Sequence, residues 1–176
     1  MRSALELFGD KNTWKLLEFF LEKQKAKKSL AQLEREVPLS RVSIAKGLRK
    51  LKKAELLSEE QVGRSILYLP DSSSPILKEV KKLLMVSYLY EAFGEYRKAG
   101  FEVYLFGSCA RGDNDEKSDI DILIIAENKK EAKSFLKTLK DERVKPLIMG
   151  KMEYASLSRK DRPFYERVEK DKIRVA

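Results

Sequence analysis

The segment Asp71-Ser72-Ser73-Ser74-Pro75 divides the chain, because it interrupts the hydrophobic periodicity found on both of its sides. Clusters of serine, aspartate and proline between periodic segments are typical of a connecting loop. A chain of 176 residues is long enough for two small domains, since domains commonly contain about 100 to 150 residues. We therefore predict one domain over residues 1–70, a linker over residues 71–75 and a second domain over residues 76–176.

The first part of the chain carries helix signals followed by a hairpin signal. Apolar residues recur at helical spacing over residues 10–23, and Ser29 and Ser40 are good N-caps for two further helices. Two short segments around Gly63 can then pair as strands. Helix, helix, short turn, helix and hairpin is the order of a winged helix-turn-helix, and residues 5–69 resemble that family.

Positive charge is concentrated between residues 23 and 53. This segment contains eleven Lys or Arg residues against two Glu, and its excess of nine equals the net charge of the whole chain, +9. A helix-turn-helix protein inserts its second helix into the major groove of double-stranded DNA. On the helix capped by Ser40, the outward side chains predicted to contact DNA are Arg41, Ser43, Lys46, Arg49 and Lys50. The alternative is a solvated charged surface, since heavy use of Lys, Arg and Glu is also thermophile-like.

The second part of the chain mixes helices and strands. Its predicted elements, in chain order, are a helix over 76–99, strands over 101–106 and 120–126, a helix around 132–139, a strand over 144–149, a short helix over 164–168 and a strand over 173–175. Together with the first part they predict an α+β protein. The long first helix is apolar on more than one side, so we expect it to be buried in a core; the alternative is a contact that forms a homodimer.

Two short segments of the second part carry residues suited to chemistry. The first ends a predicted strand with Gly107-Ser108, where glycine lets the backbone approach a phosphate and the serine hydroxyl can bind phosphate oxygens. The second begins a strand with Asp119-Ile120-Asp121, and strand alternation places the two carboxylates on one face, with Cα atoms roughly 6 to 7 Å apart. Two such charges repel unless a divalent cation binds, and oxygen ligands suit Mg²⁺.

The combination of Gly107-Ser108, ten intervening residues and Asp119-Ile120-Asp121 resembles the signature of the polymerase β-type nucleotidyltransferase superfamily. The longer match, Gly-Ser-x-Ala-Arg-Gly followed by Ser-Asp-Ile-Asp, is similar to the minimal nucleotidyltransferases of prokaryotes. The resemblance covers residues 76–176 and implies a small domain with a mixed sheet flanked by helices. It also implies roles for single residues: a nucleoside triphosphate bound by Gly107 and Ser108, with Arg111 near it, and catalysis and Mg²⁺ binding by Asp119 and Asp121.

One position departs from the pattern of this superfamily. Its active members take a third carboxylate from a neighbouring strand, where this chain has Val144-Lys145-Pro146-Leu147-Ile148. The acids that flank this run are Asp141, Glu142 and Glu153. Because a third acid helps to hold the cation that activates the acceptor, we expect any transfer by this chain to be slow.

The composition excludes several kinds of chemistry and location. The chain has no histidine and one cysteine, Cys109, which excludes the commonest general base, an intramolecular disulfide and a multi-cysteine zinc site. It contains no stretch of roughly 20 apolar residues, so we predict a protein without a membrane segment, located in the cytoplasm.

Two hypotheses about function follow from the resemblance. The first is a Mg²⁺-dependent enzyme that transfers a nucleotidyl group from a nucleoside triphosphate to an acceptor hydroxyl. The second is a DNA-binding transcriptional regulator or antitoxin-like protein, whose nucleotidyltransferase-like domain binds nucleotide or a partner with little or no turnover. Antitoxins of the minimal nucleotidyltransferase family pair with a small helical toxin, and the resemblance implies such a partner by analogy alone.

Overall fold

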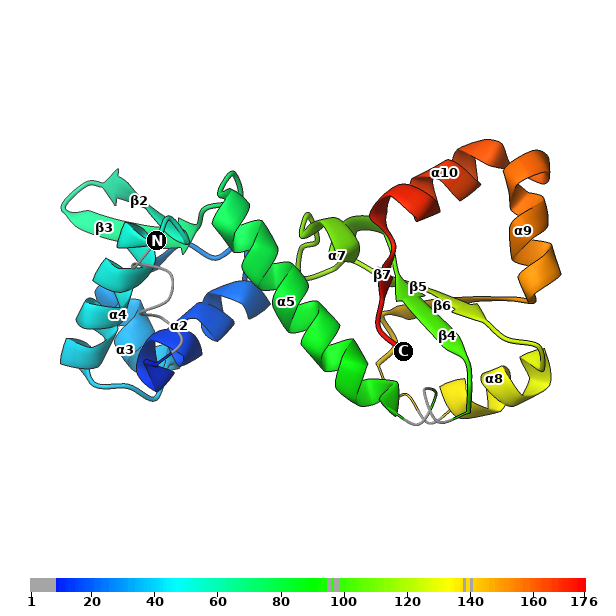
Figure 1. Ribbon diagram of the computed structural model, residues 1–176. Helices are drawn as coiled ribbons and strands as arrows, with labels where there is room; N and C mark the ends of the chain where they lie inside the picture. The colour runs from blue at the N-terminus through cyan, green and yellow to red at the C-terminus, as the bar shows by residue number, and fades with distance from the viewer. Residues whose placement is uncertain (1–8, 95, 97–98, 138, 140) are drawn as a thin grey trace. The chain divides into compact units, whose positions relative to one another are not determined.

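The computed structural model describes the chain except residues 1–8, 95, 97–98, 138 and 140, and it separates two compact units, Met1–Lys78 and Glu79–Ala176 (Figure 1). The elements of the first unit are α2 (Lys11–Glu22), β1 (Lys28–Ser29), α3 (Leu30–Glu36), α4 (Arg41–Lys53), β2 (Leu57–Val62) and β3 (Ser65–Pro70). Helix α5 (Pro75–Ala92) then leads into β4 (Glu102–Leu105), α7 (Gly107–Arg111), β5 (Ile120–Ile125), α8 (Lys129–Leu136), β6 (Val144–Met149), α9 (Lys151–Lys160), α10 (Arg162–Asp171) and β7 (Ile173–Arg174).

Side-chain caps determine where the helices of the first unit begin. The Asp10 carboxylate accepts hydrogen bonds from backbone N–H groups at the start of α2, and the Ser40 hydroxyl does so for α4. Ser29 and Gln32 form a reciprocal capping box at the start of α3. Gly63, with a φ of 59°, turns the chain between β2 and β3. The strands form an antiparallel sheet in the order β1-β3-β2, and the succession of elements is that predicted for a winged helix-turn-helix.

The helices of the first unit pack around an apolar core. Buried side chains from all three helices and from the start of the hairpin form it: Leu16, Phe20, Leu33, Ile44, Leu48, Leu51 and Leu56. Helices α2 and α4 approach closely at Gly47, where an added Cβ would lie 3.0 Å from Leu16 Cδ2. With this side of α4 in the core, Lys46 and Arg49 on the same helix are exposed.

The second unit is built on a mixed sheet with the strand order β6-β5-β4-β7. Strand β4 is antiparallel to both of its neighbours, whereas β5 and β6 are parallel and are connected through α8. Parallel neighbours require such a crossover connection. The two units together confirm the predicted α+β fold, with helices and a small sheet first and a mixed sheet with flanking helices second.

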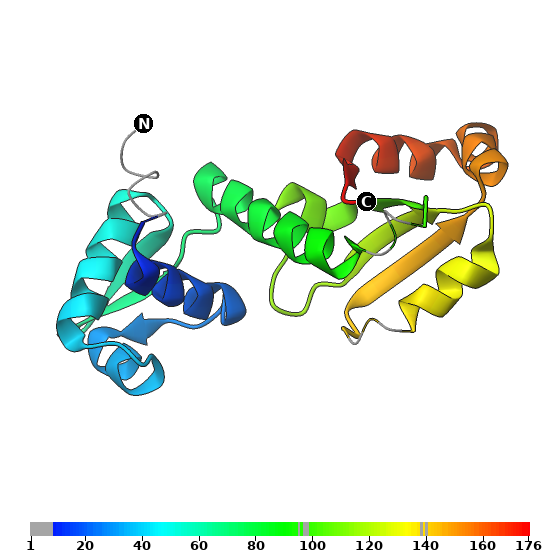
Figure 2. The same ribbon diagram turned by 60° about the horizontal axis from the view of Figure 1, so that its bottom comes forward.

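Alternation along β5 assigns its side chains to two separate cores. The even-numbered isoleucines of β5 pack with residues of α5 and α8, whereas Leu123 and Ile125 pack with residues of α9 and α10. Figures 1 and 2 show α8 and the α9–α10 pair on opposite sides of the sheet. The odd-numbered Asp121 therefore lies on the face that α9 and α10 partly cover.

Some elements differ from the sequence prediction. The sequence pattern does not predict β1, which has two residues, or α9, in which Tyr154 is the buried side chain. The helix predicted over 164–168 is the longer α10, which Asp161 caps. The helix predicted over 76–99 ends as α5 at Ala92, and its predicted continuation includes residues 95, 97 and 98, which lie outside the described part.

Among the described residues, every helix is too short or too polar to cross a membrane.

Candidate functional site

The two predicted site segments meet at the start of β5. Strand β4 ends at Leu105, and the N–H of the next residue, Phe106, donates to the Asp121 carbonyl oxygen at 3.0 Å. The chain then turns at Gly107 into the short helix α7. This turn and the aspartates of β5 are therefore neighbours in space.

Gly107 is required in the turn for two reasons. Its φ is 74°, a left-handed conformation that residues with a side chain rarely adopt. In addition, a Cβ built on Gly107 would lie 2.5 Å from Asp121 Oδ2, which is far inside van der Waals contact. The backbone of the turn therefore lies directly against the Asp121 carboxylate.

Hydrogen bonds anchor the backbone of Asp119 and Ile120 at the start of β5. The Ile120 N–H donates to the Arg143 carbonyl oxygen at 2.8 Å, and the Cys109 thiol donates to the Asp119 carbonyl oxygen at 3.4 Å. The Asp119 side chain is 59% exposed, whereas Asp121 is half-buried. Burial, and then the charge of Asp119, raise the pKa of the Asp121 carboxyl. A cation at this point would relieve both effects.

Basic groups lie near the carboxylate pair. Arg111, the residue predicted to lie beside a triphosphate, forms ion pairs with Asp171 at 2.5 Å and with Asp113 at 3.1 Å, and these raise the pKa of its guanidinium. Arg111 thus links α7 to the end of α10. Arg167 on α10 also acts on the site, since its charge and that of Arg111 counteract the rise in the pKa of Asp121. No sequence pattern indicates Arg167, because its position depends on how α10 packs on the sheet.

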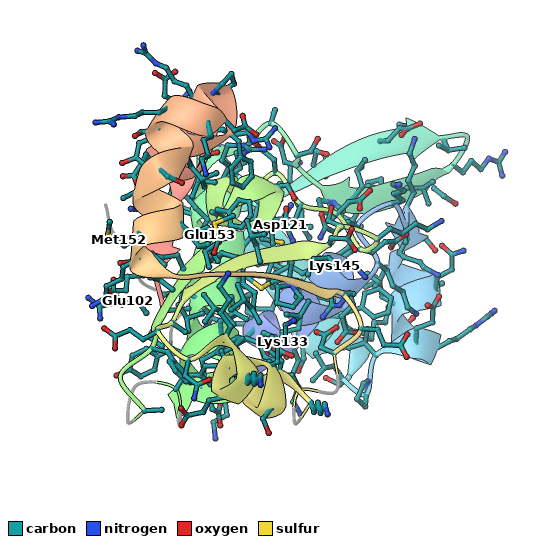
Figure 3. All side chains as sticks on the ribbon, turned by 90° about the vertical axis from the view of Figure 1, so that its right-hand side faces the viewer. Glu102, Asp121, Lys133, Lys145, Met152 and Glu153 are labelled. Atoms are coloured by element: carbon teal, nitrogen blue, oxygen red, sulfur yellow. The ribbon has the colours of Figure 1, made fainter. Side chains whose placement is uncertain are left out.

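Lys145 on β6 lies next to the aspartates of β5. Strands β5 and β6 are parallel, and Asp121 pairs with Lys145, so their side chains share one face of the sheet. The Lys145 Nζ lies 3.8 Å from Asp119 Oδ1 and donates to the Glu142 carbonyl oxygen at 3.0 Å. Figure 3 shows Asp121 and Lys145 on these two strands.

Two of the acids that flank β6 are engaged away from the aspartate pair. Asp141 pairs with Arg143 at 2.7 Å, and hydrogen bonds from Arg143 hold the pKa of Asp141 at about 2. Glu153 pairs with Lys129 and accepts a hydrogen bond from the Gly150 N–H at 3.2 Å, and both contacts lower the pKa of Glu153. Within the described part of the chain, His, Cys, Asp and Glu side chains form no group of three that could hold a metal ion.

Asp119, Asp121 and the turn at Gly107 fit one Mg²⁺ ion bound together with phosphates. Mg²⁺ is usually bound by one or two carboxylates and completes its shell with phosphate oxygens and water. The turn supplies a backbone without a Cβ beside one of these carboxylates, where a phosphate can approach. Cys109 is unsuited to nucleophilic chemistry, because its thiol is buried and burial raises its pKa.

Helix α4 presents the side chains predicted to contact DNA in two different ways. Lys46 and Arg49 are exposed, and Arg49 Nε donates to the Ala45 carbonyl oxygen of its own helix at 3.3 Å. The other three make contacts within the unit: Arg41 with Glu34 at 2.7 Å, Ser43 with Ser40 at 3.0 Å between the hydroxyls, and Lys50 with Asp10 at 2.5 Å. The hydrogen bond from Lys50 holds the pKa of Asp10 at about 2. Lys50 is thus the least available of the three basic side chains Lys46, Arg49 and Lys50.

Comparison with known proteins identifies a family for the second part of the chain. The family model for the nucleotidyltransferase domain matches residues 86–175, which is more than half of the chain. Among solved structures, an ArsR-like transcriptional regulator from Rhodococcus sp. RHA1 is similar over 56% of this chain and 83% of its own, with 26% sequence identity and a TM-score of 0.37. Among curated proteins, none matches the chain significantly.

Proposed function

The chain belongs to the nucleotidyltransferase domain family, and from this premise we propose that Gly107, Ser108, Asp119 and Asp121 bind a nucleoside triphosphate together with Mg²⁺. The observation that carries the proposal is the contact between the turn at Gly107 and the Asp121 carboxylate. It brings a backbone suited to phosphate and a side chain suited to a cation to one point.

Each group has a separate role in this proposal. Asp119 and Asp121 hold the metal ion, and the Ser108 hydroxyl with the backbone of the turn binds phosphate oxygens. Arg111 and Arg167 add positive charge beside the pair, which offsets the charge of the triphosphate. When bound, Mg²⁺ neutralises the phosphates and stabilises the leaving pyrophosphate. In the proposed reaction, an acceptor hydroxyl gives up its proton to solvent, its oxygen forms a bond to the α-phosphorus, and the bond from that phosphorus to pyrophosphate breaks.

Nucleoside triphosphates labelled on the α-phosphate test this proposal. We expect the protein to retain label from at least one nucleotide in the presence of Mg²⁺ and to lose it with EDTA. Label that becomes covalent on a macromolecule, the protein itself or one that co-purifies, indicates the enzyme. Label that stays non-covalent indicates a regulator that binds nucleotide. If none of the common nucleotides is retained with Mg²⁺, the proposal is wrong.

A second candidate function, binding of double-stranded DNA by the first unit, is favoured by the exposure of Lys46 and Arg49 on α4. These side chains lie on the helix that follows the turn, which in helix-turn-helix proteins enters the major groove. Their charge adds to the excess of Lys and Arg in residues 23–53. In this proposal the chain is a DNA-binding regulator, and its second unit supplies a nucleotide-dependent signal.

Replacement of two exposed basic residues, Lys46→Ala with Arg49→Ala, is expected to weaken binding to a 20-base-pair duplex and to flatten its dependence on salt. Each lost phosphate contact lowers the slope of log affinity against log salt by about 0.9, so the double variant should lose about 2. Fluorescence anisotropy at several salt concentrations measures this slope.

The matched control for DNA binding removes two exposed lysines of the second unit, Lys133→Ala with Lys151→Ala. It changes net charge by the same amount and should leave the slope unchanged. Equal slopes for the α4 variant and its parent would contradict the assignment of α4 to DNA.

A further inference from the structure

We propose that Lys145 is a fixed cation that takes the place of a second divalent ion, so that this site binds one Mg²⁺ with each nucleotide. The inference rests on the proposed function of the same site, and it adds that the site holds a single metal ion. A site with one metal ion is suited to holding a nucleotide, whereas two ions are needed to activate both the attacking and the leaving oxygen.

The position of Lys145 is determined by the sheet and by its own hydrogen bond. In-register pairing of Lys145 with Asp121 places the two side chains next to each other on one face. The Lys145 Nζ is held between the Glu142 carbonyl oxygen, at 3.0 Å, and Asp119 Oδ1, at 3.8 Å. The ammonium group therefore lies beside an oxygen that a second metal ion would need.

Charge decides against a second ion in this arrangement. In a two-metal site the ions lie about 3.5 to 4 Å apart and share carboxylate ligands. Here Asp119 and Asp121 contribute two negative charges, and Lys145 already offsets part of that charge at Asp119. A second divalent cation at Asp119 would be repelled both by the ammonium group and by the first ion.

Two nearby acids that could support a second ion have other partners. Asp141 is bound by Arg143 at 2.7 Å, and Glu153 is bound by Lys129 and by the Gly150 N–H. A change at Lys145 itself is therefore the most direct way to create a second site. Replacement by aspartate exchanges the fixed cation for a carboxylate on the face that Asp121 occupies.

Counting bound Mn²⁺ by electron paramagnetic resonance tests the inference. Protein is saturated with a nucleoside triphosphate analogue that carries a methylene group between the α- and β-phosphorus, so that no transfer occurs. We expect one Mn²⁺ per bound nucleotide in the parent and two in Lys145→Asp. The matched control is Lys133→Asp on α8, an exposed lysine that Figure 3 shows away from Asp121, and it should bind one.

A second variant, Lys145→Met, keeps the length of the side chain and removes its charge, and it does not depend on how well the aspartate variant folds. Without nucleotide, we expect Lys145→Met to bind Mn²⁺ roughly tenfold more tightly than the parent, because the ammonium group no longer opposes the ion at Asp119. Equal affinities in the two proteins would overturn the role of Lys145.

The outcomes separate this inference from the function on which it rests. Two Mn²⁺ ions per nucleotide in the parent would overturn the fixed-cation role and leave nucleotide binding intact. One ion in Lys145→Asp, with that variant folded by circular dichroism, would also overturn it. A parent that binds nucleotide without Mn²⁺, or binds no nucleotide, would overturn the proposed function and this inference with it.

Discussion

Replacing both site carboxylates by amides, Asp119→Asn with Asp121→Asn, is expected to abolish the stabilisation of the protein by Mg²⁺ and nucleoside triphosphate. The amides nearly preserve side-chain volume and remove the charges that we propose to hold the metal ion. A ligand at 100 times its Kd stabilises the folded state by about 2.7 kcal/mol. For a unit of this size such a gain raises the midpoint of thermal denaturation on the order of 10 °C, and the double variant should lose all of it.

The same variant should be at least as stable as the parent without ligand. Burial and the charge of Asp119 raise the pKa of Asp121, so the folded state disfavours the ionised form of this carboxyl. A carboxyl whose pKa is raised in the folded state contributes more to stability as the pH falls through that pKa. At neutral pH this carboxyl is ionised, and its charge lowers the free energy of unfolding. The amide removes this cost, which thermal denaturation in buffer without Mg²⁺ will detect as an equal or higher midpoint.

A control for the loss of two negative charges is available at the other end of the same strand. Glu127 and Glu131 are exposed and lie near the end of β5, beyond Ile125. Glu127→Gln with Glu131→Gln should keep the full stabilisation by Mg²⁺ and nucleotide. If the amide variant at Asp119 and Asp121 keeps it as well, the nucleotide site lies elsewhere in the chain.

Elements with local signals could be predicted closely from the sequence. Ser29 and Ser40 begin α3 and α4 because a serine side chain can satisfy the first N–H groups of the helix that follows it. The apolar run that contains Asp121 gives a strand at Ile120–Ile125, since a short continuous apolar run is typical of a buried strand. Strand β6, Val144–Met149, also has the predicted bounds.

Elements that depend on distant partners could not be predicted. Strand β1 exists because Lys28 and Ser29 pair with Tyr68 and Leu67, some 40 residues later in the chain. Helix α9 buries Tyr154 against a core that the sheet and α10 complete. Neither sequence segment carries its own periodic signal, since the packing partner decides the conformation.

The candidate site shows the same division between local and distant information. The spacing of Gly107-Ser108 and Asp119-Ile120-Asp121 predicts that the two segments act together, and the structure places them in contact, while their roles stay predictions. Which residue of β6 faces Asp121 depends on strand register, and a slip of one residue would bring Pro146 there. The register instead places Lys145 beside the aspartates. The sequence alone therefore does not say which residue of the run Val144 to Ile148 faces Asp121.

The turn at Gly107 is expected to tolerate no side chain without loss of nucleotide affinity. Gly107→Ala should lower the affinity for Mg²⁺ and nucleotide at least tenfold, because the new methyl group would lie 2.5 Å from Asp121 Oδ2 and must displace that carboxylate. The left-handed φ of 74° adds a cost of about 1 to 2 kcal/mol to the free energy of folding. Urea denaturation measures the stability loss, and isothermal titration with Mg²⁺ and a non-hydrolysable nucleotide measures the affinity.

Gly100→Ala is the matched control for the cost of the left-handed backbone conformation. Gly100 has the same φ of 74°, and a Cβ there would meet nothing within 4 Å. Gly100→Ala should lose the same 1 to 2 kcal/mol of folding free energy, about the cost of a left-handed residue, and keep its affinity for nucleotide.

A double-mutant cycle with Asp121→Ala isolates the effect of the clash between the new methyl group and the Asp121 carboxylate. In Asp121→Ala the carboxylate is gone, and the remaining Cβ lies at an ordinary 3.5 Å from the added methyl group. In the Asp121→Ala protein, Gly107→Ala should lower the free energy of unfolding by no more than Gly100→Ala does. The loss caused by Gly107→Ala in the parent minus its loss in Asp121→Ala gives the coupling energy between the turn and the carboxylate. A coupling energy of zero, together with unchanged nucleotide affinity in Gly107→Ala, would mean that Asp121 moves aside without consequence and that the contact at the turn does not organise the site.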